Sequence, residues 1–390
     1  MVTMLRTFKY QLYPTKSQRT IFEFWLELCR WVYNKTLWIR KSSWEENQTS
    51  LNLFDTNRLL TQWKTENLSL KKIHSQVLQN VQRKVDEAFK AFFLRLKRKE
   101  TPGYPRFKSQ GRLDSFCFPQ YPGGCHLDGN ILKSKLLRNI KLNLHRPVEG
   151  VIKTTTFKKT PTGKWFVSFS CEVPTKIFLS LTGKSVGIDL GLENFFTKND
   201  GEVIENPRFL RRDEKDLKRL HRKVSASPKG SVERRRNRLK LCKAYERISN
   251  RRLNFAHQTS RNLVNNYDVI CLEKLNVIKM LDNHFLAKSI SDAAWNIFVR
   301  FLTYKAEEAG RSLIFVDPAY TSQICSSCGN IVKKSLSTRT HRCECGLTLG
   351  RDHNAALNIL RLGTQSQATS LPRSPLLRRG SVHTSKLHPL

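Results

Sequence analysis

Four cysteines near the C-terminal end constrain the fold of this 390-residue chain more tightly than any other feature. They follow the pattern C-x2-C-x14-C-x-C and are Cys325, Cys328, Cys343 and Cys345. Four thiolates at this spacing predict one tetrahedral, structural zinc ion in a small ribbon. A glycine follows the second cysteine of each pair, Gly329 and Gly346, where a positive φ would let the backbone turn around the metal.

The second cysteine pair leaves an alternative open for the ligand set. It has one intervening residue rather than two, so His341 or His353 could replace one cysteine. Four protein ligands leave no open coordination position, and we therefore expect the zinc to fold the ribbon rather than take part in chemistry. The other six cysteines are scattered along the chain, which fits a reducing compartment better than a disulfide framework.

The net charge indicates the kind of partner. The chain has 69 Lys and Arg against 32 Asp and Glu, a formal charge of +37. This imbalance argues against an ordinary enzyme of small metabolites and favours a long polyanion, because each neutralised phosphate releases counterions. We find no apolar run of about 18 residues and no secretory signal, so we expect no membrane insertion and a cytoplasmic, prokaryotic protein that acts at the nucleoid.

The pattern of hydrophobic residues predicts an α+β multidomain fold. Residues 1–14 and 101–180 carry short alternating runs that predict a β-barrel domain. Apolar residues recur at helical spacing within 15–100, including one long run over 69–98, and we expect these helices to form an insertion in the barrel domain.

A second domain is predicted over residues 181–320 and 348–364. A strand, a hairpin and a further strand open it, as in a ribonuclease H-type (RuvC-like) nuclease sheet, and basic helices follow. The zinc ribbon, at 321–347, is then an insertion within this domain. Residues 365–390, rich in Ser, Thr, Pro and Arg, predict a disordered tail.

Three acidic residues stand at informative places in the second domain. Asp189 interrupts an apolar strand, where a charge is costly unless it is paired or binds metal. Glu273 ends another strand, and Asp352 begins the last helix. In a ribonuclease H-type sheet these places converge, and two Mg²⁺ ions between the carboxylates would activate water for phosphodiester cleavage. Taken alone, Glu273 could be a surface residue and Asp352 a helix cap.

The order Asp, Glu, Asp also separates classes of enzyme. A transposase of the Asp-Asp-Glu type would place its glutamate last, whereas the last helix here carries Asp352. The chain also lacks a His-x-His motif of the kind that accompanies a catalytic tyrosine.

Several motifs together resemble the TnpB family, the insertion-sequence-encoded nucleases related to type V CRISPR effectors. The resemblance covers nearly the whole chain. Its motifs are Gly187-Ile188-Asp189-Leu190-Gly191, Leu272-Glu273-Lys274-Leu275, Thr321-Ser322-Gln323-x-Cys325-Ser326-x-Cys328-Gly329 and Arg351-Asp352-x-Asn354-Ala355-Ala356-x-Asn358-Ile359. The family often has Asp-Arg-Asp where this chain has Gly350-Arg351-Asp352, and its second cysteine pair is commonly spaced more widely.

This resemblance implies an RNA-guided DNA endonuclease. A guide RNA from the end of the mobile element would pair with one strand of the double-stranded target, and a monomer bound to one RNA would cut both strands. Asp189, Glu273 and Asp352 would be the catalytic carboxylates that bind two Mg²⁺ ions, and Arg339 would contact the scissile region. The ribbon would set Asp352 and Arg339 against the DNA.

The resemblance also implies a surface that reads the short DNA motif next to the target. It would be formed by Asn57, Gln76, Gln79 and Asn80, whose amides can pair bidentately with adenine. Ordinary exposed helix polarity is the alternative. For the whole chain the alternatives are a nuclease-inactive RNA-guided regulator, an accessory transposition protein and a transposase that performs strand transfer itself.

Overall fold

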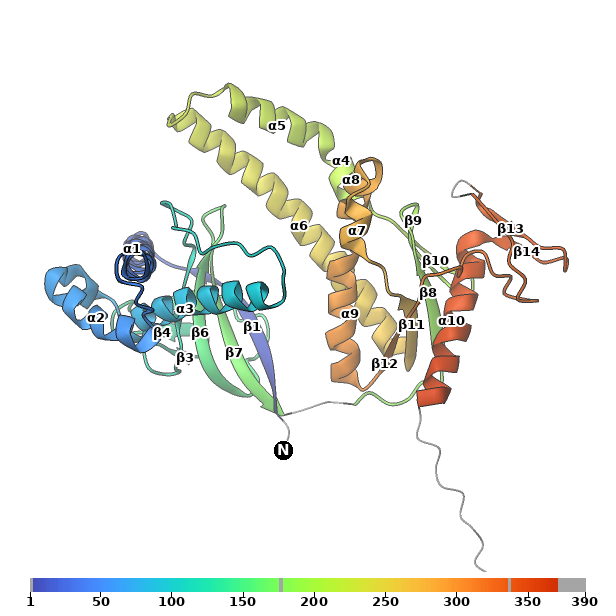
Figure 1. Cartoon of the computed structure of the whole chain (residues 1–390), viewed down its shortest axis with the longest axis horizontal. Coiled ribbons are helices and arrows are strands. Elements are labelled where there is room, and N and C mark those ends of the chain that lie inside the picture. Colours follow the sequence, from blue (N-terminus) through green and yellow to red (C-terminus); the bar gives the residue numbers. More distant parts are fainter. Residues whose placement is uncertain (1–2, 175–177, 336–337, 371–390) are drawn as a thin grey trace, which may run out of the picture. The chain divides into compact units, whose positions relative to one another are not determined.

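The computed structural model describes residues 3–174, 178–335 and 338–370, which form two compact units (Figure 1). Unit 1 comprises residues 1–175 with 238–243, and unit 2 comprises the rest. The strands of unit 1 are β1 (Thr3–Tyr13), β2 (Ser115–Phe118), β3 (His126–Asp128), β4 (Ile131–Lys133), β5 (Ile140–Leu142), β6 (Val151–Lys159) and β7 (Trp165–Pro174). Its helices are α1 (Lys16–Asn47), α2 (Leu53–Glu66), the 3₁₀ helix η1 (Leu68–Lys72) and α3 (Ser75–Lys97).

The seven strands of unit 1 form one antiparallel sheet in the order β2-β6-β7-β1-β5-β4-β3. The first strand therefore joins strands more than one hundred residues later, as expected, and the helices between them form an insertion. Within the described residues the strand pairing leaves β2 and β3 as edges, so the predicted barrel is not closed by backbone hydrogen bonds.

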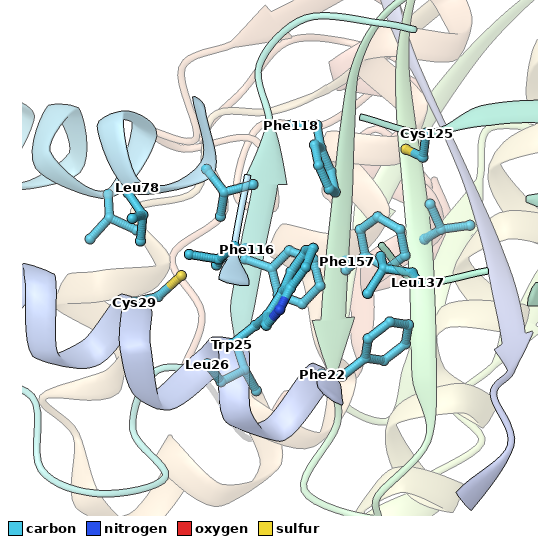
Figure 2. Close-up of a cluster of buried hydrophobic side chains, with 14 of the residues drawn as sticks. Phe22, Trp25, Leu26, Cys29, Leu78, Phe116, Phe118, Cys125, Leu137 and Phe157 are labelled. Atoms are coloured by element: carbon cyan, nitrogen blue, oxygen red, sulfur yellow. The ribbon is translucent and has the colours of Figure 1, made fainter. Parts of the chain in front are cut away.

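Aromatic side chains join the sheet and α1 into one core (Figure 2). Helix α1 begins with a capping box, because the Thr15 side chain accepts from the Gln18 backbone and the Gln18 side chain accepts from Thr15. One turn later Phe22 meets Trp165 of β7 edge-on, with ring centroids 4.7 Å apart. The long helix predicted over 69–98 is instead broken at Ile73 and His74, whose extended backbone lets Ile73 reach the core.

Unit 2 contains a five-stranded sheet, seven helices and a small hairpin within its described residues. The strands are β8 (Ser185–Leu190), β9 (Asn194–Lys198), β10 (Val203–Glu205), β11 (Val269–Glu273) and β12 (Ser312–Val316), and the hairpin pairs β13 (Thr340–Arg342) with β14 (Thr348–Gly350). The helices are α4 (Phe209–Arg212), α5 (Glu214–Ala226), α6 (Val232–Asn266), α7 (Val277–Leu281), α8 (His284–Ala293), α9 (Trp295–Ala309) and α10 (Arg351–Ser370).

The large sheet of unit 2 has the order β10-β9-β8-β11-β12. Strands β8, β11 and β12 are parallel, and β9 and β10 are antiparallel additions. Figure 1 shows α10 on one side of this sheet and α6 and α9 on the other. Because side chains alternate along a strand, Ile188 and Leu272 face α6 and α9, while Cys271 faces α10.

Glycines allow α10 to lie directly on the sheet. A Cβ at Gly187 of β8 would stand 2.2 Å from the backbone oxygen of Ala356, and one at Gly363 of α10 would stand 2.3 Å from the sulfur of Cys271. The backbone N–H of Gly187 also donates to the side chain of Asn199 (2.9 Å). The register between α10 and the sheet is therefore fixed by close backbone contact.

The C-terminal boundary of the helix corrects one prediction. The sequence predicts a disordered tail at 365–390, but α10 continues to Ser370, with the Thr364 hydroxyl donating to the carbonyl of Leu360 within the helix. The remainder of that prediction, residues 371–390, lies outside the described residues. No helix in the described part of the chain is long and apolar enough to cross a membrane.

Candidate functional site

Three elements of unit 2 bring the predicted carboxylates together. Asp189 and Glu273 lie at the carboxyl ends of the adjacent parallel strands β8 and β11, and both belong to the face that α10 covers. Asp352 lies in the first turn of α10. The charge of Asp189 interacts with those of both Glu273 and Asp352, so the three groups form one cluster.

The electrostatics of this cluster are unfavourable for three bare carboxylates. Burial raises the pKa of Asp189 well above its ordinary value, and the charges of Glu273 and Asp352 raise it further, while Arg351 opposes the rise. Burial also raises the pKa of Glu273, against a hydrogen bond from Thr321. Hard oxygen ligands that repel one another in a buried place fit a divalent cation such as Mg²⁺.

Two features stabilise the carboxylate of Asp352: a hydrogen bond from Arg351 and its place at the start of α10. The Nε atom of Arg351 donates to its Oδ1 (3.1 Å), and its position in the first turn of α10 favours a negative charge. Arg351 in turn donates its backbone N–H to the carbonyl of Arg339 (2.7 Å). Asp352 is therefore held by Arg351 at the point where the last helix begins.

The four predicted cysteines also converge. Their sulfur atoms all lie within 4.8 Å of one another. The Cys325 and Cys345 sulfurs are 3.7 Å apart, and those of Cys328 and Cys343 are 3.5 Å apart. A tetrahedron with Zn–S bonds of about 2.3 Å needs sulfur separations of about 3.8 Å. The thiols thus fit one zinc ion, and in the described ranges this is the one group of potential metal ligands that is so closely gathered.

Two turns explain how the unequal cysteine pairs form one site. Gly329 (φ +81°) donates its N–H to the carbonyl of Cys325, and Gly346 (φ +89°) donates to that of Cys343, each at 3.0 Å. The second turn is one residue shorter and still delivers both thiols. The alternative histidine ligands do not belong to the group of four: the His353 ring contacts the carbonyl of Asn199 (3.0 Å), and His341 contacts Lys334.

Two asparagines of α10 attach the first cysteine turn to the helix, a role that the sequence did not reveal. Asn354 donates to the carbonyl of Ile324 (2.8 Å) and accepts from the N–H of Ser326 (2.9 Å). Asn358 donates to the carbonyls of Thr321 (2.9 Å) and Ile324 (2.7 Å). The spacing of four residues on a helix was the available signal, because it places both amides on one face.

Arg339 pairs with an acidic residue that is not one of the three predicted carboxylates. Its guanidinium pairs with Glu193 (3.3 Å), and both side chains are more than half exposed. The pair lines a polar pocket of about 440 Å³, together with Arg208 and Arg211. Its predicted contact with the scissile region stays a prediction.

The four predicted motif-reading residues lie on two helices of unit 1. Asn57 is on α2, and Gln76, Gln79 and Asn80 are in the first two turns of α3. Gln79 is exposed, whereas the side-chain oxygens of the other three are buried and accept no hydrogen bond in the described structure. Gln76 donates to Gln120, which the sequence had not singled out.

Comparison with protein families matches three segments of the chain. Residues 168–284 match the OrfB_IS605 model, described as "Probable transposase", and residues 295–359 match a "Cas12f1-like, TNB domain". Residues 1–49 match a "Helix-turn-helix domain", although this segment folds here as strand β1 and the single helix α1.

Two solved structures have a similar fold. One is the cryo-EM structure of a Cas12f1–sgRNA–target DNA complex, with a TM-score of 0.57, 14% identity, and coverage of 92% of this chain and 98% of that one. The other is the mini-RNA-guided endonuclease CRISPR-Cas phi3, with a TM-score of 0.54, 10% identity, and coverage of 93% and 92%. They show a shared mixed α+β fold.

Curated relatives extend over almost the whole chain. A Streptomyces pristinaespiralis protein named "Putative RNA-guided DNA endonuclease" is 36% identical over 371 residues, covering 93% of this chain and 90% of the relative. The Escherichia coli protein "Putative RNA-guided DNA endonuclease InsQ" is 30% identical over 380 residues, covering 92% of each. This chain therefore belongs to the TnpB (OrfB_IS605) family of proteins.

Proposed function

We propose that this protein is an RNA-guided, metal-dependent DNA endonuclease encoded by a mobile element. It cuts double-stranded DNA next to a short motif, using a guide RNA from the end of the element. The observation that carries the proposal is the convergence of Asp189, Glu273 and Asp352, in which the pKa of Asp189 is raised by burial and by its two neighbours.

The sheet of unit 2 supports a ribonuclease H-like, RuvC-type assignment. Three parallel strands, two antiparallel additions and a helix across one face match what that fold requires, with a carboxylate from β8, β11 and α10. We assign unit 1 as the wedge domain with its helical recognition insertion. The amide of Gln79, which is exposed on α3 and can pair bidentately with adenine, supports its role in reading the adjacent motif.

The residues of the cluster have distinct tasks in the proposed reaction. Asp189 and Glu273 offer oxygen ligands from a rigid sheet, and Asp352 offers one from the first turn of α10. Bound Mg²⁺ would supply a water nucleophile and stabilise the leaving oxygen of the phosphodiester. Arg351 keeps Asp352 oriented, and the formal charge of +37 retains the nucleic acid.

Cleavage of a matched plasmid tests the proposal. The protein is copurified with its native RNA and incubated with Mg²⁺ and a plasmid that carries the matching target and adjacent motif. We expect cleavage by the wild type and none by Asp189→Ala, which should still hold the RNA. Equal cleavage by both proteins would refute the assigned site, and a protein that carries no RNA would refute the guide.

Intact carboxylates argue against the second candidate, a nuclease-inactive regulator, because such a protein would have no use for three acids that converge and repel one another. The same experiment separates the two, since a regulator would bind the matched plasmid without cutting it.

A further inference from the structure

Thr321 lies between the zinc ribbon and the carboxylate cluster. Its side chain is almost completely buried. Its hydroxyl donates to Oε1 of Glu273, and the carbonyl of Pro318, 3.2 Å away, is a second acceptor. Thr321 stands only four residues before the zinc ligand Cys325. One side chain thus connects the ribbon to a proposed catalytic carboxylate.

The segment that carries Thr321 is held on both sides. Asn358 of α10 binds its backbone carbonyl, and the two asparagines of α10 bind the residues that follow, up to Ser326. At its far end Cys325 donates its N–H to Asn330 (2.9 Å) and enters the thiol cluster. The Thr321 hydroxyl therefore has a fixed position relative to α10, the helix that also carries Asp352.

Glu273 needs such a partner. Its side chain has three rotatable bonds, whereas a metal site requires the carboxylate in one orientation. The hydroxyl binds one carboxylate oxygen and leaves the other for a cation. Asp189 has no comparable need, because its shorter side chain extends from within β8.

We infer that the zinc ribbon positions Glu273 through Thr321 and thereby raises the affinity of the carboxylate cluster for divalent cations. This inference rests on the proposed function and adds a task for the zinc, which takes no part in chemistry but supports the metal site next to it. Thr321 is a positioning residue, comparable to the outer-shell partners that orient metal ligands elsewhere.

Two substitutions at Thr321 separate this role from a packing role. Thr321→Val keeps the shape and removes the donor, while Thr321→Ser keeps the donor and removes a methyl group. Thr364→Val is the matched control, because Thr364 bonds only within α10, to the carbonyls of Leu360 and Arg361.

Mn²⁺ binding to the RNA-bound protein is measured by electron paramagnetic resonance, and zinc content by atomic emission. We expect Thr321→Val to raise the Kd for Mn²⁺ by about 10- to 100-fold with zinc retained. Thr321→Ser and Thr364→Val should bind Mn²⁺ like the wild type. Unchanged Mn²⁺ affinity in Thr321→Val, or loss of its zinc, would overturn the inference.

Removal of zinc provides a second test of the inference. Cys328→Ser combined with Cys345→Ser removes two exposed ligands, and we expect loss of zinc and weaker Mn²⁺ binding. Adding Thr321→Val to that protein should weaken Mn²⁺ binding little further, because both changes break one connection. The inference would be contradicted if the effects of the two changes on the Kd for Mn²⁺ were fully additive. It would also be contradicted if loss of zinc left the Mn²⁺ affinity unchanged. If Asp189→Asn and the wild type bind Mn²⁺ equally, the proposed function fails instead.

Discussion

The two ligand clusters of unit 2 are built in opposite ways. The four thiols come from one short stretch of chain, and two glycine turns bring them within 4.8 Å of one another. The three carboxylates come from β8, β11 and α10, which are far apart in the sequence. Their oxygens are not gathered so closely in the described structure, and their charges repel. The thiol cluster is therefore a local structure, and the carboxylate cluster depends on the whole sheet.

This difference predicts that loss of one cluster will affect the other in only one direction, from the thiol cluster to the carboxylate cluster. Loss of a carboxylate should leave the ribbon intact, because the thiols need only their own turns. Loss of zinc should disturb the carboxylates, because the ribbon is attached to α10 through Asn354 and Asn358.

Removal of one carboxylate should have the largest effect. Asp352→Asn keeps the size of the side chain and removes the charge, and we expect cleavage to fall by more than the 10- to 100-fold that is typical of outer-shell changes. Zinc content should not change. Plasmid cleavage rates and zinc analysis on the same preparation measure both. Loss of zinc in this variant would contradict the independence of the thiol cluster.

Removal of a thiol should have the next largest effect. Cys325→Ser leaves three ligands for zinc. Structural zinc binds to small zinc fingers with an apparent free energy of about 10–16 kcal/mol, and we expect the zinc affinity of this ribbon to fall by several kcal/mol in the variant. We expect zinc to be lost on dialysis against a chelator, followed by weaker protection of the first turn of α10 in hydrogen exchange. Cys242→Ser in α6 is the control, since Cys242 lies outside the thiol group.

The sequence predicted most of the two clusters, for physical reasons that differ. The thiol ligands follow from spacing alone, because the glycine turns are local. Asp189 was predicted because a charge in an apolar strand needs a partner, and its role as a metal ligand stays a prediction. Thr321, Asn354 and Asn358 have no signal of that kind, because their partners are backbone carbonyls or an acid brought near only by the fold.

The boundaries between elements were predicted less well. The break at Ile73 and His74 occurs where a buried apolar side chain gains more from reaching the core than from continuing a helix. The content of Ser and Thr predicts a disordered tail from residue 365, yet Thr364 bonds inside α10, and the helix continues to Ser370. In both places tertiary packing or local side-chain bonds outweighed intrinsic propensity.

Close packing of α10 on β8 should be sensitive to a single methyl group. Gly187→Ala would place a Cβ against the Ala356 carbonyl and the Leu360 backbone, so α10 must shift, and we expect a loss of about 1–3 kcal/mol in the free energy of unfolding. Gly103→Ala is the control, because nothing lies within 4 Å of its Cβ position. Denaturant titration measures both. A variant Gly187→Ala that cuts DNA at the wild-type rate would show that the carboxylates tolerate movement of α10.

The smallest effect should appear in the pH dependence of stability without divalent salts. Because the pKa of Asp189 is raised by folding, the folded state binds more protons than the unfolded state between the ordinary value of an aspartate and the raised value. Stability should therefore fall as the pH rises through this window, by about 1.4 kcal/mol for each unit of the rise in pKa. Asp189→Asn removes this contribution, so the difference in unfolding free energy between variant and wild type should grow with pH and shrink again when Mg²⁺ is added. Denaturant titrations at several pH values measure that difference. If it does not change with pH, neither burial nor the charges of Glu273 and Asp352 raise the pKa of Asp189, and the carboxylate cluster would resemble the thiol cluster in forming without help from its surroundings.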